Sequence, residues 1–293
     1  MTTTLSAKDA GHPRLTLTLS CPDRIGIVAA VANFLLANDC NIIDSAQFGD
    51  EQNQRFFMRV YFASLGARGQ KDLQGAFQPI GEQFGMQWHL YDASAKPRVL
   101  IMVSKFGHCL NDLLFRYRTG ALPIVIPAIV SNHRDFYQLA AAHDIPFHHL
   151  AVDASSKARQ EARLLELIES ESCDLVVLAR YMQILSPELC AKLSERAINI
   201  HHSFLPSFQG ARPYQQAHDR GVKLIGATAH YVTEDLDEGP IIEQDVSRVD
   251  HAMSVEACAA AGRDIECLVL ARAVTWHVER RILLNGHRTV IFR

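Results

Sequence analysis

Residues 175–201, LVVLARYMQILSPELCAKLSERAINIH, decide the fold that we predict for most of this chain. Two strand-length apolar runs, Leu175–Ala179 and Ala197–His201, enclose a helical segment, Pro187–Glu195. A strand, a helix and a second strand in this order form a parallel βαβ unit, and the strands of parallel sheets are apolar on both faces. The stretch therefore predicts an α/β domain.

The same alternation of strands and helices continues on either side of that stretch and predicts a Rossmann-like, mostly parallel sheet. The other predicted strands are Val99–Ser104, Pro123–Val130, Phe147–Val152 and Ile225–Val232. The other predicted helices are Arg134–Ala142, Ala158–Ser170 and a long amphipathic helix from about Val255 to Arg281. An Asn-Gly dipeptide at 285–286 predicts a closing hairpin.

Residues 14–94 follow a different order, β-α-β-β-α-β. The first strand alternates apolar and polar residues, as a half-buried strand does, and Asp23 is placed to cap the helix that follows. The predicted elements are Arg14–Ser20, Ile25–Asn38, Asn41–Phe48, Arg55–Ala63, Lys71–Phe84 and Met86–Ala93. This ferredoxin-like order predicts an α+β domain in which one sheet carries two helices on a single face.

The two patterns meet at a small, polar, proline-containing stretch, which is typical of a domain boundary. We therefore predict a tail (1–13), a first domain (14–94), a linker (95–98) and a second domain (99–293).

Composition excludes several classes of protein. The formal net charge is −3 and no long basic run is present, so nucleic acid is not an expected partner. The seven cysteines are dispersed without metal-binding spacing, which indicates reduced thiols. No secretory signal precedes the first strand, and no apolar run reaches membrane-spanning length. We expect a cytoplasmic protein.

Three polar residues could carry chemistry at the end of the sheet. Asn199 and His201 are two apart on a predicted strand, so their side chains point the same way, and Asp237 follows the next strand in a sharp turn. An amide that stabilises an oxyanion, a histidine and a water-orienting carboxylate together suit acyl transfer. His230, near the same strand end, could support them or be structural. Spacing alone fits ordinary polar residues and a plain turn equally well.

Residues 199–210, NIHHSFLPSFQG, resemble the N-I-H-x-S-x-L-P-x-x-x-G signature of the formyltetrahydrofolate transformylase superfamily. Residues 226–232 and 236–242 resemble its second signature block, and the likeness extends from Pro97 to about Trp276. The resemblance implies three catalytic residues: Asn199, His201 and Asp237. Residues 179–185, ARYMQIL, resemble the loop that lines the family's pterin pocket. It implies four substrate-binding residues: Met182, Gln183, Ile184 and Leu185.

The formyl acceptor is a separate question. In the ribonucleotide transformylases a glycine-rich loop after the first strand holds the substrate phosphate. Here that loop reads SKFGHC (104–109), with bulky Phe106 and His108 where backbone should approach a phosphate. A tRNA acceptor would call for a further RNA-binding domain. Water is therefore the acceptor that remains. The run SKFGHCLNDLL (104–114) resembles the deformylase branch of the superfamily.

That resemblance implies a hydrolase acting on a linear amide C–N bond, which converts 10-formyltetrahydrofolate to tetrahydrofolate and formate. Formate would then supply purine synthesis and balance the one-carbon pools. No metal and no cofactor are expected, because folate is the substrate. Two alternatives stay open: formyl transfer to an amine such as glycinamide ribonucleotide, and a non-catalytic folate-binding regulator.

Residues 21–28, CPDRIGIV, resemble the D-R-x-G-[IL] turn at the first strand–helix junction of ACT domains. The likeness implies that residues 14–94 form an ACT-like regulatory domain that binds a small effector, such as an amino acid, near Asp23 and Gly26. It also implies a homo-oligomer, since ACT domains commonly pair side by side.

Overall fold

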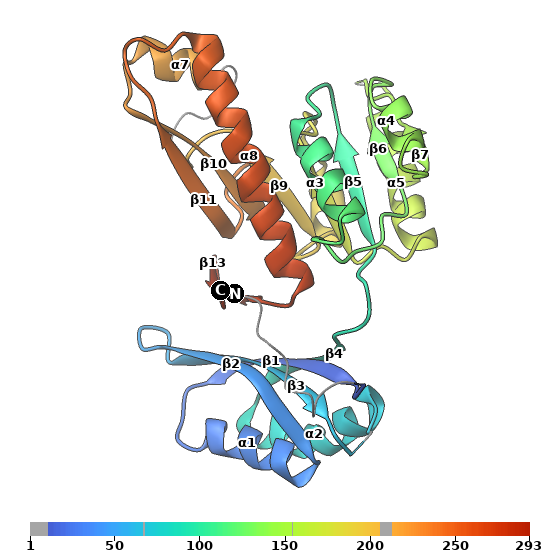
Figure 1. The fold of residues 1–293 in the computed structure, drawn as a ribbon, viewed down its shortest axis with the longest axis vertical. Coiled ribbons are helices and arrows are strands. Elements are labelled where there is room, and N and C mark those ends of the chain that lie inside the picture. Colours follow the sequence, from blue (N-terminus) through green and yellow to red (C-terminus); the bar gives the residue numbers. More distant parts are fainter. Residues whose placement is uncertain (1–10, 67, 154, 206–212) are drawn as a thin grey trace. The chain divides into compact units, whose positions relative to one another are not determined.

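Contacts divide the chain of the computed structural model into two units, which are described separately (Figure 1). The structure describes residues 11–66, 68–153, 155–205 and 213–293. Unit 1 runs to Ala95 and also contains residues 279–285 and 290–293, whereas unit 2 contains residues 96–278 and 286–289. The division falls inside the predicted linker, but the C-terminal segments of unit 1 had been predicted to belong to the second domain. Most of the predicted tail lies outside the described residues.

Unit 1 has the predicted ferredoxin-like order. Its elements are β1 (Arg14–Pro22), α1 (Ile27–Ala37), β2 (Cys40–Asp50), β3 (Arg55–Ser64), α2 (Gln70–Phe84) and β4 (Gln87–Asp92). The sheet order is β2-β3-β1-β4, and each neighbouring pair is antiparallel. Both helices lie on one face of this sheet (Figure 1). The predicted topology is therefore confirmed.

The core of unit 1 lies between the sheet and its two helices. Leu15, Leu17 and Leu19 alternate along β1 and are at most 2% exposed. Phe34 of α1 and Phe77 of α2 meet edge to face with ring centroids 5.0 Å apart, and both belong to the same core. Burial of this apolar stripe, rather than intrinsic helix propensity, holds the helices on the sheet.

The predicted cap of α1 is wrong. The helix begins at Ile27, and its N-cap is Gly26, which has a φ of 98° and makes no side-chain cap. Asp23 lies upstream of this position, where its backbone N–H donates to the carbonyl of Gln54 at 2.9 Å. Glycine takes a left-handed φ without a steric penalty, so the sharp entry into the helix depends on backbone freedom instead of a capping carboxylate.

Unit 2 is an α/β layer structure with helices on both faces of a seven-stranded sheet. Its strands are β5 (Val99–Val103), β6 (Ile129–Ser131), β7 (Phe147–His149), β8 (Leu175–Leu178), β9 (Ala197–His201), β10 (Leu224–Tyr231) and β11 (Ile241–Arg248). Its helices are α3 (His108–Arg118), α4 (Tyr137–Ala141), α5 (Lys157–Ser170), α6 (Pro187–Lys192), α7 (Pro213–Asp219) and α8 (Val255–Val278).

The strand order is β11-β10-β9-β8-β5-β6-β7. The five strands β9, β8, β5, β6 and β7 are parallel to their neighbours in this group. Strands β10 and β11 run antiparallel at one edge. Helices α5 and α6 pack on one face through a core that includes Leu164 and Leu189, while α3 and α8 pack together on the other (Figure 1). The chain reverses its direction of winding between β5 and β8, which is where open α/β sheets bind ligands.

Several predicted elements differ from the structure. The predicted strand Pro123–Val130 is reduced to β6, and Val125 keeps only an isolated bridge to Arg98. Two prolines interrupt that run, and proline cannot donate to a strand ladder. The predicted strand at 147–152 and helix at 134–142 are also shorter, as β7 and α4. Three elements were not predicted: α3, α7 and the polar edge strand β11.

The C-terminal part follows the prediction closely. Helix α8 ends at Val278, three residues before the predicted end, and Arg280 follows with a φ of 57°. Strands β12 (Ile282–Asn285) and β13 (Arg288–Ile291) form the expected hairpin, with Gly286 at a φ of 61°. Neither α8 nor another helix in the described part of the chain is long and apolar enough to cross a membrane.

Two glycines of α2 should respond oppositely to alanine. Gly75 has open space where a Cβ would lie, so Gly75→Ala should stabilise unit 1 by about 1 kcal/mol through helix propensity. A Cβ on Gly81 would lie 2.2 Å from Nε1 of Trp88, so Gly81→Ala should destabilise it by about 1–3 kcal/mol. Denaturant unfolding followed by Trp88 fluorescence, in a Trp276→Phe background, measures both. Equal changes in the free energy of unfolding for the two substitutions would contradict the close contact of Gly81 with Trp88.

Candidate active site

Strand β9 carries two polar side chains to the carboxyl end of the parallel sheet. It pairs with β8 in parallel and with β10 in antiparallel, so Asn199 lies opposite His230 and His201 lies opposite Thr228. His201 is 6% exposed, and Asn199 is half-buried. Because residues i and i+2 of a strand face the same side, the two side chains reach the same place.

A tight turn after β10 brings Asp237 to that place. Asp237 has a φ of 60°, and a Cβ on Gly239 would lie 1.7 Å from the carbonyl oxygen of Tyr231. Only glycine allows the turn to fold back so closely on the strand. Asp237 Oδ2 then lies 3.1 Å from Nδ1 of His201, and Oδ1 lies 3.6 Å from Nε2 of His230.

His230 fixes the orientation of Asn199. Its Nδ1 lies 2.9 Å from the carbonyl oxygen of Tyr231, which can only accept, so Nδ1 carries a proton. In the neutral ring Nε2 is then an acceptor, and it lies 3.2 Å from Nδ2 of Asn199. The Asn199 amide therefore donates one of its two N–H groups to this ring.

The charges of the site follow from its packing. Burial raises the pKa of Asp237, but the His201 and His230 rings beside it outweigh burial and hold this pKa well below the usual range. Burial, with the nearby charges of Arg180 and His201, lowers the pKa of His202 to about 4. At neutral pH the site therefore contains an ionised Asp237 and an uncharged His202.

A cavity of about 240 Å³ opens beside these residues. Its lining comes from unit 2 and includes Asn199, His201, His230 and Asp237, together with Met182, Gln183, Ile184 and Leu185. The loop that supplies the last four is held at both ends. The Met182 N–H donates to Oγ of Ser104 at 2.9 Å, and the Ser186 N–H donates to Glu161 at 2.9 Å.

The structure thus brings all but two of the predicted site residues into one cavity. The exceptions are Asp23 and Gly26, which belong to unit 1. The residues at the end of the signature, Pro206–Gly210, lie outside the described residues. The catalytic and binding roles assigned from the sequence stay predictions.

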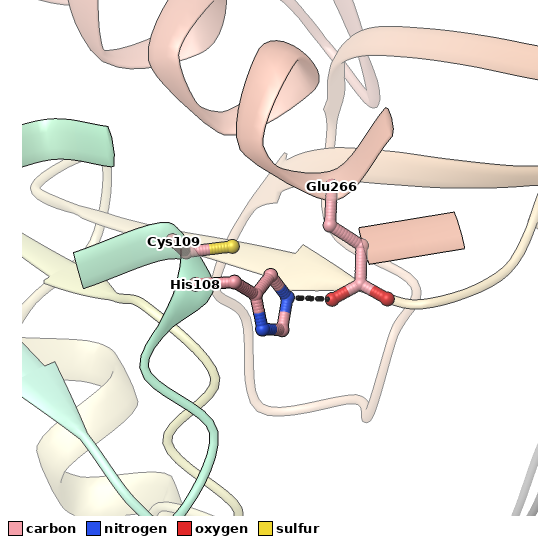
Figure 2. A group of neighbouring side chains, drawn as sticks. All are labelled: His108, Cys109 and Glu266. Atoms are coloured by element: carbon pink, nitrogen blue, oxygen red, sulfur yellow. Dashed lines mark hydrogen bonds and ion pairs between the residues drawn. The ribbon is translucent and has the colours of Figure 1, made fainter. Parts of the chain in front are cut away.

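A second polar group, absent from the prediction, lies beside the cavity around Glu266 of α8. The Glu266 carboxylate is 1% exposed and lies 2.7 Å from Nε2 of His108, as Figure 2 shows. The Tyr214 hydroxyl donates to the other carboxylate oxygen at 2.6 Å. Nε of Arg180 lies 3.3 Å from the same oxygen that His108 contacts. The sequence contained one indication of this network, because Glu266 is an acidic residue among the buried apolar residues of α8.

His108, Cys109 and Glu266 place three potential metal-ligand atoms within 4.8 Å of one another (Figure 2). The charges of this group disfavour a cation. The Arg180 guanidinium is already paired with the carboxylate. A hydrogen bond with Cys267, together with burial, raises the pKa of Cys109 well above its usual value, so the thiol stays protonated. We interpret the group as a buried hydrogen-bonded network.

The comparisons with known proteins agree with this geometry. Residues 97–274 match the Formyl transferase family model. A formyltetrahydrofolate deformylase from Corynebacterium sp. (strain P-1) is 51% identical over 96% of this chain and 98% of its own length. The chain belongs to the formyltetrahydrofolate deformylase family. The deformylase from Bacillus subtilis (strain 168) is 48% identical over 97% of this chain and 96% of its own.

Solved structures separate two branches of the fold. The crystal structure of a formyltetrahydrofolate deformylase from Burkholderia mallei has a TM-score of 0.92 and 56% identity, and covers 96% of this chain and 100% of its own. A glycinamide ribonucleotide transformylase from Symbiobacterium toebii has a TM-score of 0.63 and 30% identity, and covers 68% of this chain and 95% of its own. The likeness to deformylases extends over both units.

The lowered pKa of His202 predicts a pH effect on stability. The folded pKa of about 4 lies below the ordinary value of 6.5, so between these values the unfolded chain binds more protons. Stability should be full above pH 6.5 and fall as the pH drops toward 4. Between pH 7 and pH 5 the wild type should lose about 2 kcal/mol more than His202→Phe, whose ring does not titrate.

The measurement is denaturant unfolding followed by Trp276, in a Trp88→Phe background, so that the one remaining tryptophan reports unit 2. If both proteins lose the same free energy between these two pH values, His202 is not held neutral in the folded state.

Proposed function

We propose that this chain hydrolyses 10-formyltetrahydrofolate to tetrahydrofolate and formate. The observation that carries the proposal is the convergence of Asn199, His201 and Asp237 at one cavity, with Asp237 Oδ2 3.1 Å from the His201 ring. An amide donor, an imidazole and an ionised carboxylate are the groups that hydrolysis of an amide requires. The deformylase relatives support the choice of substrate.

The first step is attack by water. The pterin lies along the loop that contains Met182–Leu185, and the formyl group lies beside Asn199. Asp237 is ionised, so it accepts a proton from a water molecule whose oxygen attacks the formyl carbon. The second N–H of Asn199 and the His201 ring donate to the oxygen that becomes negative. Such a donor is typically worth about 10²–10³ in rate.

The second step is collapse of the tetrahedral intermediate. The bond between the formyl carbon and the folate nitrogen breaks, and that nitrogen takes a proton delivered through Asp237, His201 or a water chain. The formic acid so formed loses its proton to solvent at neutral pH and leaves as formate, together with tetrahydrofolate. His230 acts on this step indirectly, since its ring holds the Asn199 amide in place.

Water, and not an amine, fits the acceptor side of this site. The loop that would hold a substrate phosphate contains Phe106 and His108, and the His108 ring is committed to Glu266 at 2.7 Å. Arg180 packs 5.7 Å from the centroid of the Phe106 ring. Side chains therefore occupy the place where backbone N–H groups would meet a phosphate.

Formate release from 10-formyltetrahydrofolate, with no amine present, tests the proposal. Asp237→Asn should reduce kcat by about 10²–10⁴-fold, because the group that takes the water proton is lost. Asp235→Asn is the matched control: Asp235 lines the same cavity two residues away, is exposed, and should retain turnover near the wild type.

Near-normal hydrolysis by Asp237→Asn would sink the role of that residue. Formyl transfer to glycinamide ribonucleotide in preference to water would favour the amine-acceptor alternative. Folate binding with no turnover in either assay would favour a regulator.

The remaining assignments follow from this function. We propose that the enzyme needs no metal and no cofactor, since its own side chains supply the acid, the base and the oxyanion donors. The formate that it releases would enter purine synthesis, and the reaction would balance the one-carbon pools. We place the enzyme in the cytoplasm.

We also propose that unit 1 is an ACT-like regulatory domain that pairs with its copy in a homo-oligomer. Its ferredoxin-like sheet supports this, and so does the left-handed Gly26 at the start of α1, beside Asp23 in sequence. A panel of amino acids, tested on formate release and on the sedimentation of the full chain, examines the proposal. An effector whose action survives Gly26→Ala unchanged would place the effector site elsewhere.

A further inference from the structure

Three buried polar atoms in the described part of the chain have no hydrogen-bond partner: Nε and Nη1 of Arg180 and Nε2 of His201. Both residues line the same cavity, and they are 8% and 6% exposed. An unpaired buried donor costs about 1–3 kcal/mol, and more when it is charged. Such atoms gathered at one cavity point to a ligand that supplies acceptors.

Glu266 does not satisfy the hydrogen-bond donors of Arg180, although the two side chains form an ion pair. One oxygen of its carboxylate accepts from Tyr214 at 2.6 Å, and the other lies 2.7 Å from the His108 ring. Arg180 Nε lies farther off, at 3.3 Å, in a geometry that makes no hydrogen bond. The guanidinium therefore retains N–H groups for another acceptor.

The backbone also holds Arg180 in place at a cost. Its φ is 65°, a conformation that non-glycine residues seldom adopt. The Ser104 N–H donates to the Arg180 carbonyl at 3.2 Å, and the Arg180 N–H donates to Leu178 at 3.0 Å. The side chain is thus directed inward by a fixed loop at the end of β8.

The His202 ring lies beside His201 and is influenced by Arg180. His201 and His202 stack with centroids 5.0 Å apart, and the charges of Arg180 and His201 both act on His202. With His202 uncharged, a small anion in the cavity would meet the guanidinium of Arg180 and the unpaired Nε2 of His201. A carboxylate has two oxygens to accept from such a pair.

We propose that Arg180, with Nε2 of His201, forms a subsite for a small carboxylate, and that this carboxylate is formate. The proposal rests on the hydrolysis proposed above, whose product is formate. The product leaves the catalytic group at His201 with a full negative charge, and Arg180 receives it. Arg180 is thereby a product-binding residue, and formate should inhibit turnover through it.

Formate binding is measured on the full chain without folate, by saturation-transfer difference NMR observed on the formate proton. Arg180→Met should weaken binding by about tenfold or more, the loss expected for a charge-assisted hydrogen bond. Arg163→Met, an exposed arginine of α5, is the control and should leave it unchanged. Because Arg180→Met leaves Glu266 buried and uncompensated, the double variant Arg180→Met/Glu266→Gln provides a second test without an unpaired charge.

Glu266→Gln alone separates an anion subsite from a structural role. Removing a neighbouring negative charge should tighten formate binding by about 3- to 10-fold, whereas a purely structural pair would give no gain. Wild-type affinity in the arginine variants, or no tightening in Glu266→Gln, overturns the proposal.

The same titrations with 4-aminobenzoyl-glutamate identify the source of the carboxylate. If Arg180→Met weakens binding of that fragment and not of formate, the subsite holds the folate tail and the formate assignment is wrong. Failure of the proposed hydrolysis would appear separately, as absence of formate release by the wild type.

Discussion

The carboxylate of Asp237 lies between two histidine rings, and the rest of the site depends on this contact. His201 and His230 come from neighbouring antiparallel strands, β9 and β10, so their relative position is fixed by the sheet. Asp237 reaches them only because its turn takes a φ of 60° and folds back on Tyr231 at Gly239. Strain in the turn is offset by the contacts with the two rings that it makes possible.

Much of this arrangement was predictable from the sequence. Periodicity gave the alternation of strands and helices in unit 2 and the ferredoxin-like order of unit 1, since both depend on which faces are apolar. The spacing of Asn199 and His201 predicted a shared face, because a strand has a period of two. Spacing alone could not bring Asp237 to them, and the family signature supplied that contact.

What escaped prediction has physical reasons. Gly26, rather than Asp23, is the N-cap of α1, and a left-handed backbone cannot be recognised from hydrophobic periodicity. The edge strand β11 is polar, and edge strands are commonly charged. The network around Glu266 joins α3, α7 and α8, so its members are far apart in the chain. Only the tertiary structure makes them neighbours.

Gly262 illustrates how far such a network constrains the sequence. It lies within α8, where glycine costs about 1 kcal/mol relative to alanine. A Cβ there would lie 2.1 Å from the hydroxyl of Tyr214, which donates to Glu266. The two positions are therefore an epistatic pair: evolution can strengthen the helix at 262 only by shortening the side chain at 214. Such a change would leave Glu266 with one donor fewer.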